Sequence, residues 1–131
     1  MLRELEAHHA TLINLIADMV EVTAAGSPDL ARLAATRLKL SRASRARTGF
    51  LVAAVYPAVL ARVADSQAEQ VRNLQREAED QRATSSRHIG TWSSEKISAD
   101  WPGFQRASAS IRAMMLERIE REKKILYPLL G

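Results

Sequence analysis

The amino-acid sequence predicts an all-α protein, folded as an antiparallel up-down-up-down four-helix bundle. Ala, Leu, Arg and Glu dominate the composition, and these residues favour helix. Apolar side chains recur at spacings of three and four residues along long segments, a period typical of helices that pack on one another. No segment alternates apolar and polar residues as a strand does. Short turn sequences join the segments, so neighbouring helices are expected to run antiparallel.

The first predicted helix covers residues 2–23, and its apolar face includes a histidine. That face reads Leu2, Leu5, His9, Leu12, Ile16 and Met19. The neighbouring His8 lies about 100° away around the helix and is expected to point elsewhere. Residues 24–29 predict a turn, in which Gly26 ends the first helix and Ser27 caps the next one.

The second predicted helix covers residues 28–63, and its later part is less regular. The inward face of that part reads Leu40, Ser44, Arg47, Leu51, Ala54 and Ala58. Gly49 and Pro57 are poor residues for the interior of a helix. We therefore expect a bend or fraying beyond Tyr56.

The third and fourth predicted helices cover residues 66–94 and 101–129. Asp65-Ser66 offers the N-cap of the third helix, and Asp100 is expected to cap the fourth after a short connection. The inward face of the third helix is polar in its middle and reads Val71, Leu74, Ala78, Gln81, Ser85, His88 and Trp92. The inward face of the fourth reads Ile111, Met115, Arg118, Glu122, Ile125 and Leu129.

Two segments, one in the second predicted helix and one in the fourth, repeat the same pattern. At equal spacings, the first has Arg47, Leu51, Tyr56 and Pro57, and the second has Arg118, Glu122, Tyr127 and Pro128. A charge on an apolar face is costly unless it is paired or holds a ligand. Arg118 and Glu122 therefore predict either a buried salt bridge or the remnant of a site.

Together with the sequence around His9, these repeats resemble the hemerythrin-like (HHE cation-binding) family. The resemblance spans essentially the whole chain and rests on residues 9–16 and the two Tyr-Pro repeats. It implies a four-helix bundle that holds a di-iron centre and senses or stores oxygen, iron or nitric oxide. The family pattern places a histidine first in each repeat, where this chain has Arg47 and Arg118. It places a carboxylate a turn or so later, where this chain has Leu51 and Glu122.

Only His9 and Glu122 match the ligands that this family would supply. The chain has three histidines in all, too few for a di-iron centre like the family's. Arginine keeps its proton at every accessible pH and does not ligate metal. We therefore expect no cofactor. The alternative is a mononuclear residual site of His9, His88 and Glu122, since two imidazoles and a carboxylate can hold iron or zinc.

In place of a metal, we expect a buried polar cluster. Its members are His9, Arg47, Arg118 and Glu122. Arg118 can pair with Glu122 one turn along the same helix. The sequence thus predicts a non-enzymatic binding, regulatory or scaffold module, and the alternative function is hemerythrin-like metal binding. No cysteine, Ser-His-acid pattern or glycine-rich phosphate loop favours an enzyme.

The charge pattern bears on partners. Residues 30–64 hold seven basic residues and no acidic one. These basic residues scatter around the helix without forming a stripe, and no aromatic platform accompanies them, so we expect no nucleic-acid partner. The expected partner is an unknown protein or a second copy of the chain. Self-association is expected through an apolar stripe on the fourth helix, made of Leu116, Ile119, Leu126 and Leu130.

Length and composition set the remaining expectations. At 131 residues the chain is expected to form one domain, residues 1–131, with a core of its own. The N-terminus lacks the apolar core of a signal peptide, and no apolar run is long enough to span a membrane, so we expect a cytoplasmic protein. We expect Trp92, Trp101 and Phe104 to close one end of the core; a pocket beside His88 is the alternative.

Overall fold

The computed structural model describes residues 1–131, which are helical almost throughout and form no strand. The elements are α1 (Leu2–Thr23), α2 (Leu30–Phe50), the π-helix η1 (Leu51–Val55), α3 (Tyr56–Leu60), α4 (Asp65–Thr91), α5 (Ser94–Ala99) and α6 (Trp101–Leu130). The prediction of an all-α protein is confirmed. None of these helices combines the length and the apolar character needed to cross a membrane.

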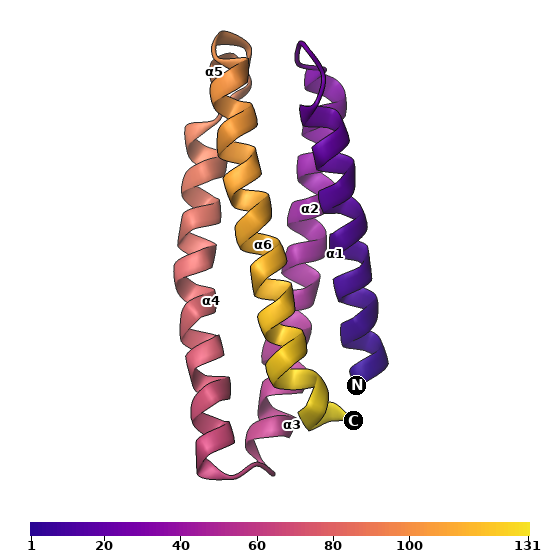
Figure 1. Ribbon diagram of the computed structural model, residues 1–131, viewed down its shortest axis with the longest axis vertical. Helices are drawn as coiled ribbons and strands as arrows, with labels where there is room; N and C mark the ends of the chain where they lie inside the picture. Colours follow the sequence, from indigo (N-terminus) through magenta and orange to yellow (C-terminus); the bar gives the residue numbers. More distant parts are fainter.

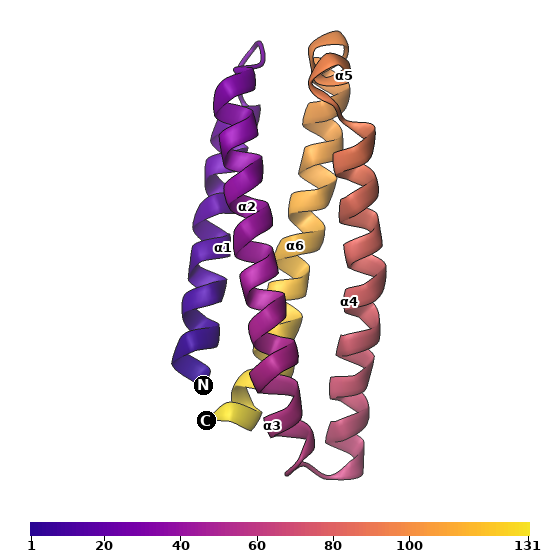
Figure 2. The same cartoon turned by 180° about the vertical axis from the view of Figure 1, so that it is seen from behind.

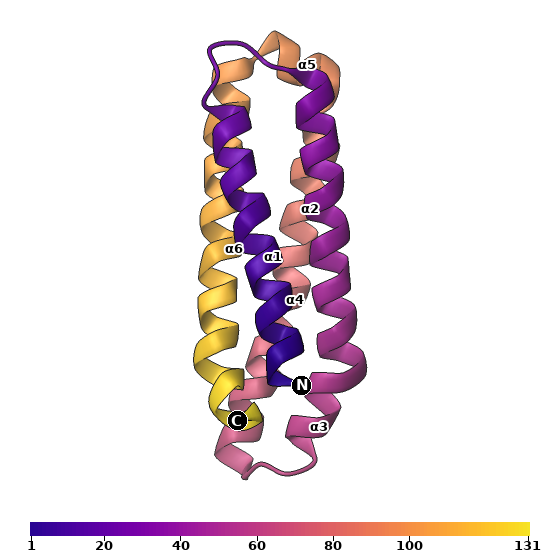
Figure 3. The same ribbon diagram turned by 90° about the vertical axis from the view of Figure 1, so that its right-hand side faces the viewer.

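The long helices lie side by side along the longest axis of the molecule (Figure 1). Both chain ends lie at the end where α3 is found, and the short helix α5 lies at the opposite end (Figures 1 and 2). Helix α1 contacts both α2 and α6, and α4 also contacts α6. The view from the side shows α1 passing between α2 and α6 in projection (Figure 3). Side chains from α1, α2, α4 and α6 can therefore meet in the interior.

Helix α2 begins later than the sequence suggested. The Asp29 side chain accepts a hydrogen bond from the backbone N–H of Arg32 at 3.1 Å, so Asp29 is the N-cap in place of Ser27. Asp and Ser are comparably good N-caps, and use of the later one leaves Pro28 outside the helix. Helix α1 ends at Thr23, and Gly26 does not adopt the left-handed conformation.

The N-caps of α4 and α6 differ in how well they were predicted. Ala64, and not the predicted Asp65-Ser66, precedes α4, and its backbone N–H donates to the Gln67 side chain at 3.3 Å. The Asp65 carboxylate then lies in the first turn, where the helix dipole favours a negative charge. The Asp100 cap of α6 is confirmed: its side chain accepts from the Gly103 N–H at 3.0 Å. A Cβ atom at position 103 would collide with that carboxylate.

The predicted irregularity near Pro57 is present but lies before Tyr56. Residues Leu51–Val55 form η1, in which the Tyr56 N–H donates to the Leu51 carbonyl, and the chain then continues as α3 to Leu60. Proline has no N–H, and its ring clashes with the carbonyl four residues earlier in a regular α-helix. The π-turn accommodates Pro57 without ending the helix, which continues to Leu60, three residues short of the predicted end at residue 63. Such π-turns are frequent at functional sites.

The interior contains three apolar clusters. The end that carries the chain termini is filled by Leu5, Leu51, Val55, Tyr56, Val59, Val71, Leu74 and Leu126. The opposite end, called here the aromatic cluster, holds Met19, Val22, Leu33, Ile97, Trp101 and Phe104. Between them lie Leu12, Ile16 and Ile119. The predicted inward face of α1 is confirmed, because His9 and its apolar neighbours from Leu5 to Met19 are buried.

The stripe that was expected to mediate self-association is not a surface. Ile119 and Leu126 are buried in the core, and of the four stripe residues only Leu116, at 41 % exposure, is a large exposed apolar side chain. Helix α6 contacts α1 on one side and α4 on another, so it buries a wider arc than one apolar stripe. The prediction of an exposed apolar stripe on the fourth helix is therefore wrong.

Candidate functional site

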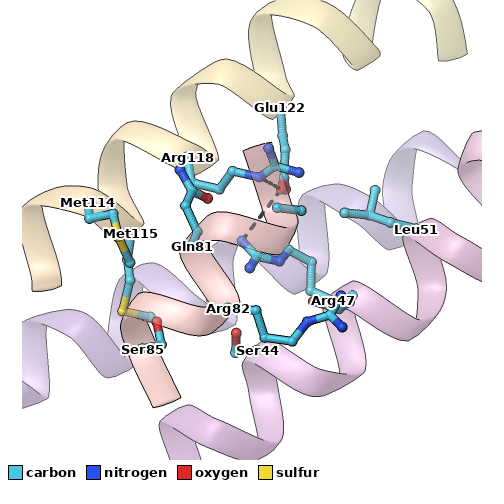
Figure 4. Close-up of a pocket in the computed structure, with 12 residues that line it drawn as sticks. Ser44, Arg47, Leu51, Gln81, Arg82, Ser85, Met114, Met115, Arg118 and Glu122 are labelled. Carbon is cyan, nitrogen blue, oxygen red and sulfur yellow. Dashed lines mark hydrogen bonds and ion pairs between the residues drawn. The ribbon is translucent and has the colours of Figure 1, made fainter. Parts of the chain in front are cut away.

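Glu122 on α6 is a fully buried carboxylate, at 0 % exposure, and both of its oxygens are bound. Oε1 accepts a hydrogen bond from Nε2 of His9 on α1 at 2.7 Å. Oε2 accepts from Nε of Arg118, one turn earlier on α6, also at 2.7 Å. Nη1 of Arg47, from α2, lies 3.7 Å from Oε2 (Figure 4). We call these four residues the charge cluster.

Arg118 uses each of its nitrogens. Besides the bond from Nε to Glu122, Nη1 donates to the Leu74 carbonyl of α4 at 2.7 Å. Nη2 donates to the Tyr56 hydroxyl at 3.1 Å. The side chain is 4 % exposed, and the planar fork of the guanidinium suits several partners at once. Arg118 therefore joins three elements, α6, α4 and α3, at a single point.

His9 lies between a carboxylate and a phenol. A carboxylate accepts hydrogen bonds only, so Nε2 of His9 carries the proton that bonds Glu122. The other nitrogen, Nδ1, lies 2.6 Å from the Tyr127 hydroxyl. Burial raises the pKa of Tyr127 to about 12, with help from the negative charges of Glu6, Glu122 and Glu120. Tyr127 thus keeps its proton at neutral pH and can donate it to an imidazole.

The environment keeps Glu122 ionised. Burial by itself would raise the pKa of this carboxyl group. The hydrogen bond from His9 and the positive charges of Arg47 and Arg118 outweigh burial, and the pKa falls below its ordinary value of 4.5. Burial also raises the pKa of Tyr56, although Arg118 opposes it. At neutral pH the charge cluster therefore contains a carboxylate, and the neighbouring phenols of Tyr56 and Tyr127 are neutral.

A second carboxylate extends the charge cluster toward the surface. Glu77 on α4 accepts two hydrogen bonds from Arg121, both at 2.8 Å. Its Oε2 also lies 3.9 Å from Nη1 of Arg118. Because Glu77 is partly exposed, water screens this pair more than the pairs around Glu122.

The structure brings together the four residues that the sequence predicted to cluster. It also adds Tyr56 and Tyr127, which sequence reasoning used only as marks of the repeat. The sequence contained an indication of their role, because each tyrosine lies five residues after Leu51 or Glu122 in its repeat. The repeats interlock: Tyr56 of the first bonds Arg118 of the second, and Arg47 of the first approaches Glu122 of the second.

His88 is not part of the charge cluster. Its ring stacks on Phe104 of the aromatic cluster, with ring centroids 5.9 Å apart. Burial, helped by the positive charge of Arg37, lowers the pKa of His88. Phe104 also contacts Trp92 and Trp101, so the prediction that these aromatic side chains close one end of the core is confirmed.

The residues present do not fit a di-iron centre. No three side chains of the types His, Cys, Asp and Glu lie together in a way that could hold a metal ion. His9 and Glu122 are bonded to each other, while Arg47 and Arg118 bring positive charge to the same place. The residual site of His9, His88 and Glu122 is not assembled either, because His88 lies against the aromatic cluster.

A pocket of about 110 Å³ lies beside the charge cluster (Figure 4). It is lined by side chains of α2, η1, α4 and α6, among them Arg47, Arg82, Arg118 and Glu122. In the close-up, Arg47 and Arg118 reach toward Glu122. Met114 and Met115 lie on the side of the pocket away from Glu122 (Figure 4).

Comparison with protein-family models, with curated proteins and with solved structures finds no match for this chain. The geometry of the charge cluster and its pocket is therefore the basis on which function is assigned.

Proposed function

We propose that this chain is a metal-independent, non-enzymatic binding module. In this proposal it is an up-down-up-down four-helix bundle of the hemerythrin-like type, and the charge cluster takes the place of the di-iron centre. The observation that carries the proposal is that both oxygens of Glu122 already accept a hydrogen bond, from His9 and Arg118 at 2.7 Å each. A carboxylate held in this way has a structural role.

The electrostatics of the charge cluster supports the same conclusion. A divalent cation at Glu122 would have to displace the imidazole and one guanidinium group. Both arginines would then lie beside the metal with their charge uncompensated, and such buried unpaired charges are costly. Three further contacts hold Arg118 in place, because it also donates hydrogen bonds to Leu74 and Tyr56 and lies near Glu77.

The same geometry argues against acid-base catalysis at Glu122. A general acid or base must present its proton to a substrate within hydrogen-bonding distance. Glu122 has a lowered pKa and no free oxygen, and His9 has a partner on each ring nitrogen. A ligand can instead enter the pocket beside the charge cluster, and binding is therefore the function that we propose.

Metal analysis of the purified protein tests the proposal. Protein made in iron-supplemented cells is expected to be colourless, to carry far less than one metal ion per chain, and to melt at the same temperature with or without a chelator. Near-stoichiometric iron, a visible oxo-iron absorption and a melting temperature lowered by chelator would contradict it.

A variant that restores the family pattern provides the matched control. Arg47→His, Leu51→Glu and Arg118→His together return imidazole and carboxylate groups to the two repeats. If arginine is the reason that iron does not bind, this triple variant is expected to acquire iron under conditions in which the parent protein does not. Equal metal content in the two proteins would mean that the arginines are not the reason why the parent protein binds no iron.

A further inference from the structure

The pocket beside the charge cluster is rich in positive charge. Three guanidinium groups, those of Arg47, Arg82 and Arg118, line it together with one carboxylate, Glu122. Both oxygens of that carboxylate are already bound within the chain. The pocket therefore presents an excess of cationic donors to whatever enters it (Figure 4).

Arg47 has donor capacity that the protein does not use. Its Nε is buried and has no hydrogen-bond partner. Its Nη1 lies 3.7 Å from Glu122, which is an ion-pair distance but too long for a hydrogen bond. A buried donor without a partner costs free energy, and native structures rarely keep one without a reason. Arg118 differs, because each of its three nitrogens has a partner.

The rest of the lining suits a small polar guest. Ser44, Thr48, Gln81 and Ser85 add hydroxyl and amide groups from α2 and α4, and hydroxyl and amide groups can donate hydrogen bonds to an anion. The volume of about 110 Å³ is somewhat below the ~150 Å³ cavity that accommodates benzene in another protein. Arg82, whose side chain is 60 % exposed, brings the pocket to the surface.

We propose that this pocket binds a small oxyanion, a carboxylate or phosphate group, with Arg47 as its main ligand. This inference rests on the proposed function and names the ligand class of that binding module. A guanidinium group can donate two parallel hydrogen bonds to either type of anion, and such charge-assisted bonds are among the strongest in proteins. The anion would accept from the terminal Nη groups of Arg47, whose guanidinium makes only an ion pair within the chain, and would balance the positive charge of the pocket.

The test is a calorimetric titration of the 131-residue chain, whose metal content is measured first. Sodium acetate and inorganic phosphate serve as probes, with sodium chloride at matched ionic strength as the reference. At least one of the two oxyanions is expected to bind saturably with one site per chain, and chloride is not. Binding of acetate alone identifies a carboxylate site, and binding of phosphate alone identifies a phosphate site.

Variants identify the pocket as the place of binding. Arg47→Gln is expected to weaken binding about tenfold or more, because it removes the charge-assisted hydrogen bonds of the guanidinium group. Arg76→Gln removes an exposed arginine from α4, outside the pocket, and is expected to leave binding unchanged. Ser85→Leu fills the pocket without touching Glu122 and is expected to abolish binding, so it decides the question if Arg47→Gln does not fold.

Three results would overturn the inference: no oxyanion binding above that of chloride, wild-type affinity in Arg47→Gln, or wild-type affinity in Ser85→Leu. The two proposals fail in different ways. A protein that carries stoichiometric metal contradicts the proposed function. A metal-free protein that binds neither oxyanion contradicts only the inference about the pocket.

Discussion

The charge cluster and the aromatic cluster contain similar residue types in different surroundings. When the side chains that pack against each cluster are included, each region has a histidine, at least one arginine and aromatic side chains. In the charge cluster, His9 and Arg118 are held by the carboxylate of Glu122. In the aromatic cluster, the His88 ring stacks on Phe104, and the Arg37 guanidinium lies 5.7 Å from the centre of the same ring.

The carboxylate makes the difference between the two regions. Glu122 compensates the arginines around it, and they keep its pKa low. Arg37 has no such partner: it donates to the Trp92 carbonyl, burial lowers its pKa, and its Nη2 is unpaired. Members of the charge cluster therefore depend on one another, whereas His88 is held mainly by packing. Removal of one member of the charge cluster should therefore be costly, whereas removal of the His88 imidazole should be mild.

The largest effect is expected from Glu122→Leu. This change leaves Arg118 and Arg47 without their shared counter-charge, and breaking a buried ion pair costs about 3–5 kcal/mol. Urea unfolding measures the loss in the free energy of unfolding. Glu117→Leu, at an exposed position of the same helix, is the control and should stay within about 0.5 kcal/mol of the wild type. Equal losses in both variants would show that Glu122 is not a special position.

The two histidines provide the next contrast. His9→Leu removes the donor to Oε1 of Glu122 and should cost about 1.5–3 kcal/mol, as expected for a hydrogen bond to a charged group. His88→Leu keeps an apolar contact with Phe104, so its cost should be below about 1 kcal/mol. Urea unfolding of the two variants side by side checks this order. The reverse order would mean that the aromatic cluster is the more interdependent region.

The pH dependence of stability should also separate the regions. Because the folded pKa of Glu122 lies below 4.5, the unfolded chain binds the proton first as the pH falls. The contribution of Glu122 to the free energy of unfolding is therefore fully present above the ordinary pKa of 4.5. It is lost as the pH falls through the pKa of the folded state. Unfolding followed between neutral and acid pH should show this decline in the wild type and a shallower one in Glu122→Gln. Parallel curves would mean that the folded chain does not lower the pKa of Glu122.

The smallest effect is expected from Tyr127→Phe. The change removes the hydroxyl beside His9 and should cost about 1 kcal/mol or less, since Tyr127 is only partly buried. A spectroscopic titration provides the sharper test. With a folded pKa of about 12, the phenol contributes stability that is present below its ordinary pKa of 10.0 and is lost as the pH rises through 12. The phenolate signal of Tyr127 is obtained as the difference between the wild type and Tyr127→Phe. It should appear at a pH well above 10.0, whereas a midpoint near pH 10.0 would mean that the folded chain does not raise the pKa of Tyr127.

Periodicity explains which parts of the site could be predicted. It fixes the direction of a side chain around its helix, and this sufficed to place His9, Arg118 and Glu122 on inward faces. It does not fix the height of one helix against another. His88 was therefore considered as a third metal ligand beside His9 and Glu122, although the structure places it at the aromatic cluster. The roles of Tyr56 and Tyr127 also depend on which helices meet, and sequence spacing does not reveal that.

Competition between local signals explains most of the errors in the predicted elements. Ser27 and Asp29 are both good N-caps, and only the packed chain selects between them. Pro57 predicted a disturbance, but not that a π-turn would absorb it before Tyr56. The apolar stripe through Ile119 and Leu126 was interpreted as a surface, because the sequence does not show that α6 contacts both α1 and α4.

The central claim, that Arg118 and Glu122 stabilise each other inside the protein, is tested most directly by a double-mutant cycle. Unfolding free energies are measured for the wild type, Arg118→Met, Glu122→Leu and the double variant. The predicted coupling is about 2 kcal/mol or more, and the double variant is expected to be more stable than Glu122→Leu alone, because it no longer buries an arginine whose carboxylate has been removed. Costs that simply add, to within about 0.5 kcal/mol, would contradict the account.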